Sequence, residues 1–193
     1  MRIIAGTARS LPLKTVEGPD TRPTTDRIKE TLFNILGSNV SGSVFLDLFA
    51  GSGSVGLEAV SRGALRAVFV DHSRRAVSCI RDNIEFTKFD LQCDVLCMDF
   101  MAGLKALEGQ YVFDILFLDP PYGKGLSKQA LMYLGTSSLC GENSIVIVEE
   151  SIDFVTEDLE VDGFSVCRIK TYKSNQHIFL KKGESDGLVR KTS

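Results

Sequence analysis

The sequence predicts an α/β protein with a mostly parallel sheet that is buried on both faces. From Ser43 onward, continuously apolar runs alternate with segments of helical periodicity, as in parallel strands that are buried on both faces. Near the C-terminus, two strand-like segments flank residues 173–175, which predicts a hairpin and an antiparallel pair at the end of the sheet. The expected strands cover residues 44–48, 67–71, 95–98, 113–118, 144–148, 164–172 and 176–180.

The segments around the strands carry helix and turn signals. A first helix is expected over residues 24–36, where apolar side chains recur at helical spacing between a capping threonine, Thr24 or Thr25, and Gly37. Residues 1–20 are expected to form a short extended unit, and Pro and Gly within residues 18–23 predict a loop. The later helices are expected over residues 54–63, 73–87, 100–108 and 126–135.

Length and composition fit one globular domain. The chain has 193 residues, of which 44% are hydrophobic and 24% charged, so it can build a core. No apolar run reaches the roughly 18 residues of a membrane span. Residues 1–6 lack the apolar core of a signal peptide, so we expect a cytoplasmic protein. Five cysteines without a C-x-x-C pair and two distant histidines offer no zinc ligand set, so no metal is expected.

Charge is distributed unevenly along the chain. The net charge is −3, yet residues 1–34 carry +2 and residues 163–193 carry +5, whereas residues 142–162 carry −8. A polyanion could dock on the basic ends, because the local field matters more than the total charge. An ordinary solvated surface explains the same pattern equally well.

A glycine-rich turn follows the first expected strand. Residues 50–56 contain a complete G-x-G-x-x-G between a strand and a helix, and Asp71 ends the next strand. Such a turn lets a ligand approach backbone N–H groups at a helix N-terminus, and the aspartate can bind a ribose diol. Two ligands fit this pattern, a dinucleotide such as NAD and S-adenosylmethionine.

Asp47 favours the second ligand. A carboxylate so close to the turn repels a pyrophosphate and attracts the ammonium and sulfonium groups of S-adenosylmethionine. Asp99 could accept a hydrogen bond from an adenine amino group, although a purely structural cap is the alternative for Asp47, Asp71 and Asp99 alike. Phe49 and Phe100 could pack against the cofactor, although core packing is the more common role of such side chains.

The fourth expected strand ends in Asp119-Pro120-Pro121-Tyr122. Because proline has no N–H, the Asp119 carboxylate and the Pro120 carbonyl form a rigid set of acceptors beside the aromatic face of Tyr122. Acceptors without donors suit a substrate that brings N–H groups, such as the exocyclic amino group of a nucleobase. A plain turn at the end of a strand is the alternative. Both motifs follow strand ends, so we expect them at the same edge of the sheet, where such folds bind ligands.

This arrangement suggests a chemistry for the motif. Hydrogen bonds to Asp119 and Pro120 would aim the lone pair of the amino nitrogen at a methyl sulfonium about 3–3.5 Å away. The negative charge would stabilise the cation that develops on the nitrogen, and Tyr122 would stack on the extruded base.

The motifs together resemble those of class I S-adenosylmethionine-dependent methyltransferases: D-L-F-A-G-S-G at 47–53, V-D at 70–71 and D-P-P-Y at 119–122. The N-terminal part narrows the resemblance to the RsmD family, through M-R-I-I-A-G at 1–6, R-P-T-T-D-R-I-K-E-T-L-F-N at 22–34, G-L-E-A at 56–59 and S-R-G-A at 61–64. That family methylates N2 of a guanine in bacterial small-subunit (16S) rRNA. The resemblance extends to about residue 182.

The resemblance implies a Rossmann-like class I methyltransferase fold, a mostly parallel seven-stranded sheet with its last strand antiparallel and helices on both faces. It also implies S-adenosylmethionine as cofactor, and small-subunit rRNA or the assembling small subunit as partner. It implies an RNA-gripping extension over residues 1–23 and a methyltransferase domain over residues 24–182. We expect a disordered tail over residues 183–193, a monomer, and a thin RNA grip at residues 7–12, where Arg9 is the one basic residue.

The resemblance also supports a set of site residues. The cofactor residues would be Asp47, Phe49, Ala50, Gly51, Ser52, Gly53, Asp71, Asp99 and Phe100. The catalytic residues would be Asp119, Pro120, Pro121 and Tyr122. The RNA contacts would be Arg2, Arg9, Arg22, Thr24, Arg27, Lys29 and Lys124.

Three other functions stay open on the sequence. An N-methyltransferase could act instead on amino groups of DNA bases or on a glutamine amide of a protein. A nicotinamide-dependent oxidoreductase would use the glycine turn and have no use for D-P-P-Y. A non-catalytic RNA-binding module would not need the intact Asp119 motif.

Overall fold

The structure is a computed structural model that describes residues 1–16, 25–159, 161, 163–183 and 190–192. These residues form two compact units, Met1–Gly103 and Leu104–Ser193. Helix α4 (Phe100–Leu107) crosses the boundary between the units. The predicted boundary at residue 23 lies outside the described residues, as do Arg22 and Thr24. Among the residues described, no helix has the length and apolar character needed to cross a membrane.

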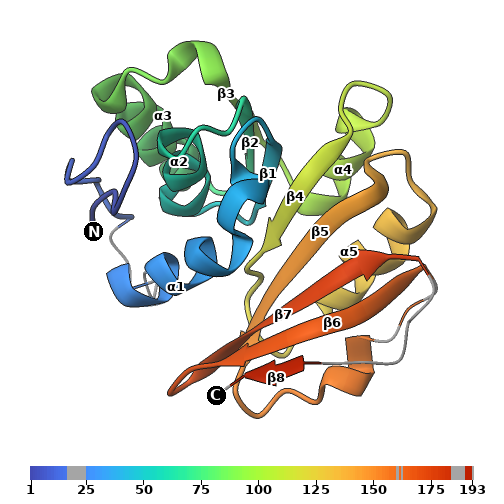
Figure 1. Ribbon diagram of the computed structural model, residues 1–193. Coiled ribbons are helices and arrows are strands. Elements are labelled where there is room, and N and C mark those ends of the chain that lie inside the picture. Colours follow the sequence, from blue (N-terminus) through green and yellow to red (C-terminus); the bar gives the residue numbers. More distant parts are fainter. Residues whose placement is uncertain (17–24, 160, 162, 184–189, 193) are drawn as a thin grey trace. The chain divides into compact units, whose positions relative to one another are not determined.

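Three parallel strands form the sheet of the first unit (Figure 1). Strand β2 (Arg66–Asp71) pairs on one side with β1 (Val44–Leu48) and on the other with β3 (Cys93–Cys97). Residues 67–70 of β2 have no exposed surface, which confirms the expectation of a parallel sheet buried on both faces. The helices of this unit are α1 (Asp26–Leu36), η1 (Gly37–Val40), α2 (Ser54–Ser61), α3 (Arg74–Thr87) and η2 (Asp90–Gln92).

Side-chain caps define where two of these helices begin. Of the two threonines that the sequence offers for α1, Thr25 is the cap, and its side chain accepts a hydrogen bond from the N–H of Ile28 at 3.4 Å. Ser73 caps α3 in the same way, through the N–H of Ala76 at 3.4 Å. Each cap satisfies a backbone donor that the first helical turn leaves without a partner.

The second unit is a mixed sheet (Figure 1). Strand β4 (Phe113–Leu118) pairs in parallel with β5 (Cys140–Ser151), and β7 (Asn175–Lys182) is antiparallel to both β5 and β6 (Phe164–Thr171). The predicted hairpin that closes the sheet is therefore confirmed. This unit also contains α5 (Leu126–Thr136) and η3 (Thr156–Leu159).

Two features of the second unit differ from the sequence-based expectation. Strand β5 extends from Cys140 to Ser151, well beyond the expected residues 144–148. Its pairing with β7 continues through the polar Glu149 and Glu150, and at its other end Cys140 pairs with Phe113 of β4. In the segment expected to be a disordered tail, residues 190–192 form a short strand, β8 (Arg190–Thr192), parallel to β6. Residues 184–189 and 193 lie outside the described residues.

The N-terminal segment, residues 1–16, is attached to α2 through its own backbone. The Glu58 carboxylate accepts hydrogen bonds from the N–H of Ile4, at 2.7 Å to Oε2, and of Ala5, at 3.0 Å to Oε1. The Ser61 hydroxyl donates to the carbonyl of Ala5 at 2.6 Å. A Cβ on Gly6 would lie only 1.7 Å from the carbonyl oxygen of Ser61, so this close approach requires glycine.

Candidate active site

Asp47, in β1, holds the start of α2 at the glycine turn. Its Oδ2 accepts a hydrogen bond from the N–H of Gly56 at 2.9 Å, and the residue is 2% exposed. Gly53 is the N-cap of α2 and has a left-handed backbone with φ +74°. A Cβ on Gly56 would lie 2.3 Å from Cε1 of Phe69, so only glycine lets the helix pack this closely on β2. The predicted strand, turn and helix are all present here.

The burial of Asp47 changes its protonation. Burial raises the pKa of its carboxyl to about 7; the hydrogen bond from Gly56 opposes this rise, and the charge of Asp71 adds to it. A cationic group bound beside this carboxyl would favour its ionised form. The electrostatics of the turn therefore suit an ammonium or sulfonium group and disfavour a pyrophosphate.

Asp71, at the end of β2, joins two turns. Its Oδ2 accepts from the N–H of Gly51 at 2.9 Å, and its Oδ1 accepts from the N–H of Ser73 at 2.8 Å. The structural role that the sequence left open is thus present. It fixes a carboxylate, 11% exposed, at the glycine turn. Binding of a ribose diol by Asp71 stays a prediction.

Two aromatic rings meet beside the turn. Phe49 has a left-handed backbone, with φ +72°, and its N–H donates to the carbonyl of Val70 at 3.0 Å. Its ring lies 5.1 Å from that of the buried Phe100, measured between centroids. Asp99 is exposed, and its Oδ1 accepts from the N–H of Met101 at 2.9 Å, so it caps α4. A left-handed phenylalanine costs on the order of 1–3 kcal/mol, a strain that is often found at functional sites.

Asn83 of α3 connects the glycine turn to the N-terminal segment, a role that sequence reasoning missed. Its Nδ2 donates to the carbonyls of Ser52 and Lys14, each at 3.0 Å, and its Oδ1 accepts from the N–H of Lys14 at 2.8 Å. Asn83 is 1% exposed. The available signal was an amide on the apolar face that Ile80 and Ile84 share, because a polar side chain buried there needs partners.

The Asp119-Pro120-Pro121-Tyr122 motif follows the end of β4 in the second unit. Asp119 is half-buried, Pro120 is buried and Pro121 is exposed. Tyr122 is 43% exposed, while its hydroxyl donates to Oε1 of Glu149 at 3.1 Å. The motif thus presents a carboxylate and an aromatic ring whose outer end is anchored to a second carboxylate.

Glu149 is the centre of a buried polar network that sequence reasoning missed. Its Oε1 also accepts from Nδ2 of Asn175 at 2.6 Å, and its Oε2 lies 2.9 Å from Nε2 of His177. Burial acts to raise the pKa of Glu149, but His177, Asn175 and Tyr122 outweigh it and hold that pKa below its ordinary value. The signal in the sequence was the charged pair Glu149 and Glu150 at the end of a buried strand.

The predicted cofactor residues lie together in the first unit, where Asp47, Asp71 and Asp99 each fix the backbone of a turn or helix start. The predicted catalytic motif, residues 119–122, belongs to the second unit. The expectation that the two motifs meet at one edge of the sheet stays a prediction.

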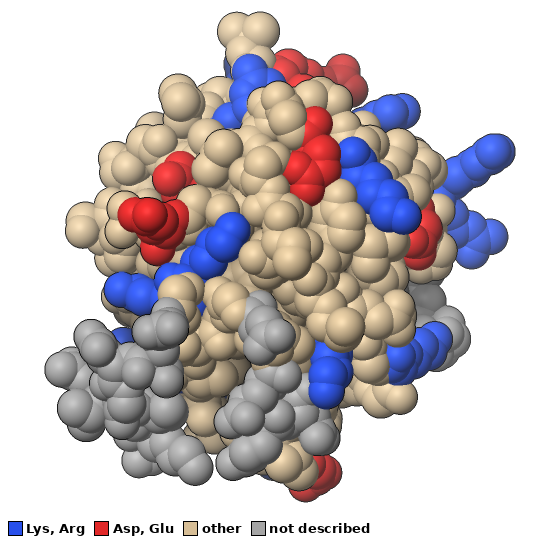
Figure 2. All heavy atoms as spheres, turned by 90° about the vertical axis from the view of Figure 1, so that its right-hand side faces the viewer, with Lys and Arg blue, Asp and Glu red and all other residues tan. Residues whose placement is uncertain are grey.

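Four of the predicted RNA contacts are exposed. The side chain of Arg2 is 61% exposed and its Nε donates to Asp26 at 2.9 Å; Arg9, Arg27 and Lys124 are also exposed. On the face drawn in Figure 2, basic side chains stand in separate groups among acidic and uncharged ones.

Lys29 was wrongly expected to contact RNA. It has no exposed surface, and its Nζ donates to the carbonyl of Arg2 at 2.6 Å and lies 3.5 Å from Oε2 of Glu58. The reason is its position, because Lys29 shares the buried face of α1 with Leu32, Phe33 and Leu36 at helical spacing. Its charge holds the N-terminal segment and cannot reach a phosphate.

Comparisons with known proteins agree with the motifs. Residues 1–181 match the family model described as conserved hypothetical protein 95. The chain is 36% identical to YlbH of Bacillus subtilis, a candidate rRNA methyltransferase, over 185 residues that cover 95% of this chain and 100% of the relative. It is 37% identical to ribosomal RNA small subunit methyltransferase D of Haemophilus influenzae, over 79% of this chain and 80% of that protein.

A solved structure supports the fold. The chain is similar to the candidate methyltransferase yhhF of Escherichia coli, with a TM-score of 0.81 and 29% identity over 96% of this chain and 99% of that one. The predicted Rossmann-like α/β fold is confirmed.

Proposed function

The chain belongs to the family described as conserved hypothetical protein 95, the RsmD family, and from that membership we propose that it methylates the exocyclic N2 of a guanine in small-subunit rRNA. The observation that carries this proposal is the motif at residues 119–122. It combines a half-buried carboxylate, two prolines without N–H donors and a partly exposed aromatic ring with an anchored hydroxyl.

The glycine turn supports S-adenosylmethionine as the methyl donor. This cofactor supplies an electrophilic methyl group on a cationic sulfur. Asp47, Asp71 and the turn over residues 49–53 would hold it, and the buried Asp47 carboxyl matches its cationic ammonium. The same carboxyl, when ionised, would repel the pyrophosphate that a nicotinamide-dependent oxidoreductase would bind at this turn.

The motif in the second unit would hold the amino group. The Asp119 carboxylate and the Pro120 carbonyl would accept hydrogen bonds from the two N–H groups, which keeps the lone pair of the nitrogen available. As the N–C bond formed and the bond between the methyl group and sulfur broke, positive charge would develop on that nitrogen, and the Asp119 carboxylate would stabilise it. One proton then leaves the nitrogen along its hydrogen bond to Asp119 and passes to solvent, which the half-buried carboxylate reaches.

The exposed basic residues would position the RNA. Arg2, Arg9, Arg27 and Lys124 can reach phosphates, and binding through such contacts weakens as salt rises. The base would be extruded from its stack and received by the ring of Tyr122.

A methyl-transfer assay tests the proposal directly. Labelled S-adenosylmethionine is incubated with the protein and with small ribosomal subunits that lack the modification, and the labelled nucleotide is then mapped. We expect one labelled guanine in the small-subunit rRNA and none in large subunits. Parallel reactions with double-stranded DNA and with a protein carrying a candidate glutamine cover the other N-methyltransferase substrates, and labelling of either in place of rRNA overturns the proposal.

A further inference from the structure

We propose that Glu149, supported by Asn175 and His177, is a positioning residue that fixes the ring of Tyr122 for stacking on the target base. This inference rests on the function proposed above and adds a residue that acts through Tyr122 rather than on the substrate. The Tyr122 hydroxyl belongs to the hydrogen-bond network around Glu149.

The strand register makes Glu149 a fixed point. Glu149 on β5 lies directly opposite His177 on β7, so both side chains project from the same face of the sheet. Asn175, two residues before His177, lies on that face as well and donates to the same carboxylate. Both carboxylate oxygens are therefore held from one rigid strand.

Burial strengthens this anchor. Glu149 is 6% exposed and His177 has no exposed surface. The imidazole ring makes edge contacts with Phe117, at 5.7 Å between centroids, and with Tyr172, at 5.0 Å. In such surroundings a carboxylate without partners would be strongly disfavoured, so its donors stay in place.

The chain of contacts continues beyond the imidazole. Because the ionised Glu149 can only accept hydrogen bonds, Nε2 of His177 carries the hydrogen and donates to it. Nδ1 of the same ring lies 3.2 Å from the hydroxyl of Tyr172. With its two nitrogens engaged on opposite sides, the imidazole cannot rotate away from Glu149.

Tyr122 combines a fixed end with an open face. Its hydroxyl is bound 3.1 Å from Glu149 Oε1, yet 43% of the residue remains exposed. A ring held in this way loses little further freedom when a base stacks on it, so the cost of ordering it is met during folding. An unanchored ring would have to be ordered in every turnover.

A double-mutant cycle tests this role. Tyr122→Phe removes only the hydroxyl at a partly exposed position, so it keeps the ring and threatens folding little. Glu149→Ala removes the acceptor. We expect each variant to lower the single-turnover rate about tenfold, the loss of one hydrogen bond to a charged group, with the Kd for S-adenosylmethionine unchanged. The double variant should be no slower than the slower single variant, because both changes remove the same contact.

The controls separate positioning from general destabilisation. Glu149→Gln retains an acceptor oxygen for Tyr122 and should restore most of the rate. Tyr133→Phe removes another phenol hydroxyl that is bonded to a glutamate, Glu108, and should leave the rate unchanged. Effects of Tyr122→Phe and Glu149→Ala that multiply in the double variant, or a wild-type rate in either single variant, would overturn the proposal.

A measurement without substrate keeps this inference distinct from the proposed function. In protein labelled with 13C and 15N, the three-bond couplings of Tyr122 between Cγ and the backbone nitrogen and carbonyl carbon should have the values of one fixed χ1 rotamer. Glu149→Ala should move these couplings to values averaged over several rotamers. Averaged couplings in the wild-type protein overturn the inference even if rRNA is methylated, whereas a protein that does not methylate rRNA overturns the proposed function alone.

Discussion

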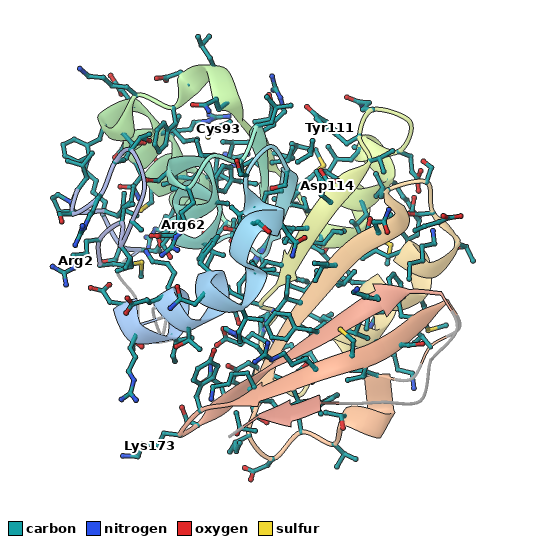
Figure 3. The ribbon with its side chains drawn as sticks, viewed as in Figure 1. Arg2, Arg62, Cys93, Tyr111, Asp114 and Lys173 are labelled. Carbon is teal, nitrogen blue, oxygen red and sulfur yellow. The ribbon has the colours of Figure 1, made fainter. Side chains whose placement is uncertain are left out.

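Lys29 and Glu58 form an ion pair with no exposed surface, in which Nζ of the lysine lies 3.5 Å from Oε2 of the glutamate. The same carboxylate binds Arg62 at 2.7 Å, and the guanidinium of Arg62 lies over the ring of Phe33 at 5.0 Å. Figure 3 labels Arg62 of the first unit and Arg2 of the N-terminal segment. One buried carboxylate therefore joins helices α1 and α2 to the backbone of the N-terminal segment.

Neutralising Glu58 should destabilise the first unit. Glu58→Gln leaves the buried ammonium of Lys29 without its counter-charge, which we expect to lower the free energy of unfolding by roughly 3–5 kcal/mol. Denaturant unfolding measures this change. The control is Asp82→Asn, which breaks an exposed ion pair with Lys14 (2.9 Å) and should have no measurable effect. Equal stability of the two variants would contradict the central role of Glu58.

Cofactor binding should strengthen as the pH rises through 7. Since the pKa of Asp47 is about 7 in the folded protein, its carboxyl is largely protonated at pH 6 and must ionise to bind a cationic ammonium. Binding then releases up to one proton, which calorimetry in buffers of different ionisation enthalpy detects. Asp47→Asn should abolish the proton release and weaken binding by about 1.5–3 kcal/mol.

The same shift predicts how stability without cofactor depends on pH. The unfolded chain ionises Asp47 near its ordinary value of 3.8, whereas the folded chain retains the proton up to about 7. The contribution of this residue to the free energy of unfolding should therefore fall between about pH 4 and pH 7. Comparison of the wild-type protein with Asp47→Asn across this range isolates the contribution, and parallel pH profiles of the two proteins would refute it.

A side chain at position 56 should disturb the glycine turn. Because a Cβ on Gly56 would lie 2.3 Å from the ring of Phe69, Gly56→Ala forces α2 away from β2 and should cost about 1–3 kcal/mol. Gly141→Ala is the matched control, since its Cβ would meet Val112 at an ordinary 3.6 Å and should change stability by less than about 0.5 kcal/mol. Thermal unfolding compares the two variants, and S-adenosylmethionine binding should weaken in the first alone.

Removing the Asp119 carboxylate should slow turnover strongly but leave cofactor binding unchanged. We expect Asp119→Ala to lower kcat by roughly 10²–10⁴-fold, because in the proposed mechanism this carboxylate contacts the nitrogen that receives the methyl group. Asp153→Ala, which changes an exposed aspartate of the same unit, is the control. Single-turnover rates and the Kd for S-adenosylmethionine give the two readouts, and a wild-type rate in Asp119→Ala would refute the mechanism.

Arg27 and Lys29, both on α1, should differ in their effects on RNA binding and on stability. Arg27 is exposed, and Arg27→Ala should reduce the slope of log Kd for RNA against log salt by about 1 without changing stability. Lys29→Met should lower stability and leave that slope unchanged, because Lys29 is buried. A reduced slope in Lys29→Met would show that burial does not keep this lysine from RNA.

Local patterns in the sequence predicted the elements of the fold closely. Apolar runs and a capping residue such as Thr25 depend on neighbours within a few positions, so they can be recognised without the structure. The full length of β5 could not be predicted, since Glu149 and Glu150 belong to it only through their pairing with β7. Pairing between distant segments is not a local property.

The same difference between local and long-range features explains which site residues could be predicted. Asp47, Asp71 and Tyr122 stand in motifs whose chemistry can be inferred from residue type and spacing. Glu149 and Asn83 were missed because their roles arise from partners 26–28 and 31–69 residues away in the chain. For Lys29 the charge was a misleading signal, and its place on the apolar face of α1 was the better one.

The N-terminal segment is bound mainly through main-chain groups, with the N–H groups of Ile4, Ala5 and Ala8 donating to side chains of α2. Such bonds do not depend on the side chains that the segment turns toward solvent. Its outward residues, Arg9 among them, can be exchanged during divergence without loosening the attachment. Relatives could thus acquire different preferences for their target while keeping the same anchor, and a designer could graft new surface residues onto this segment with little risk to folding.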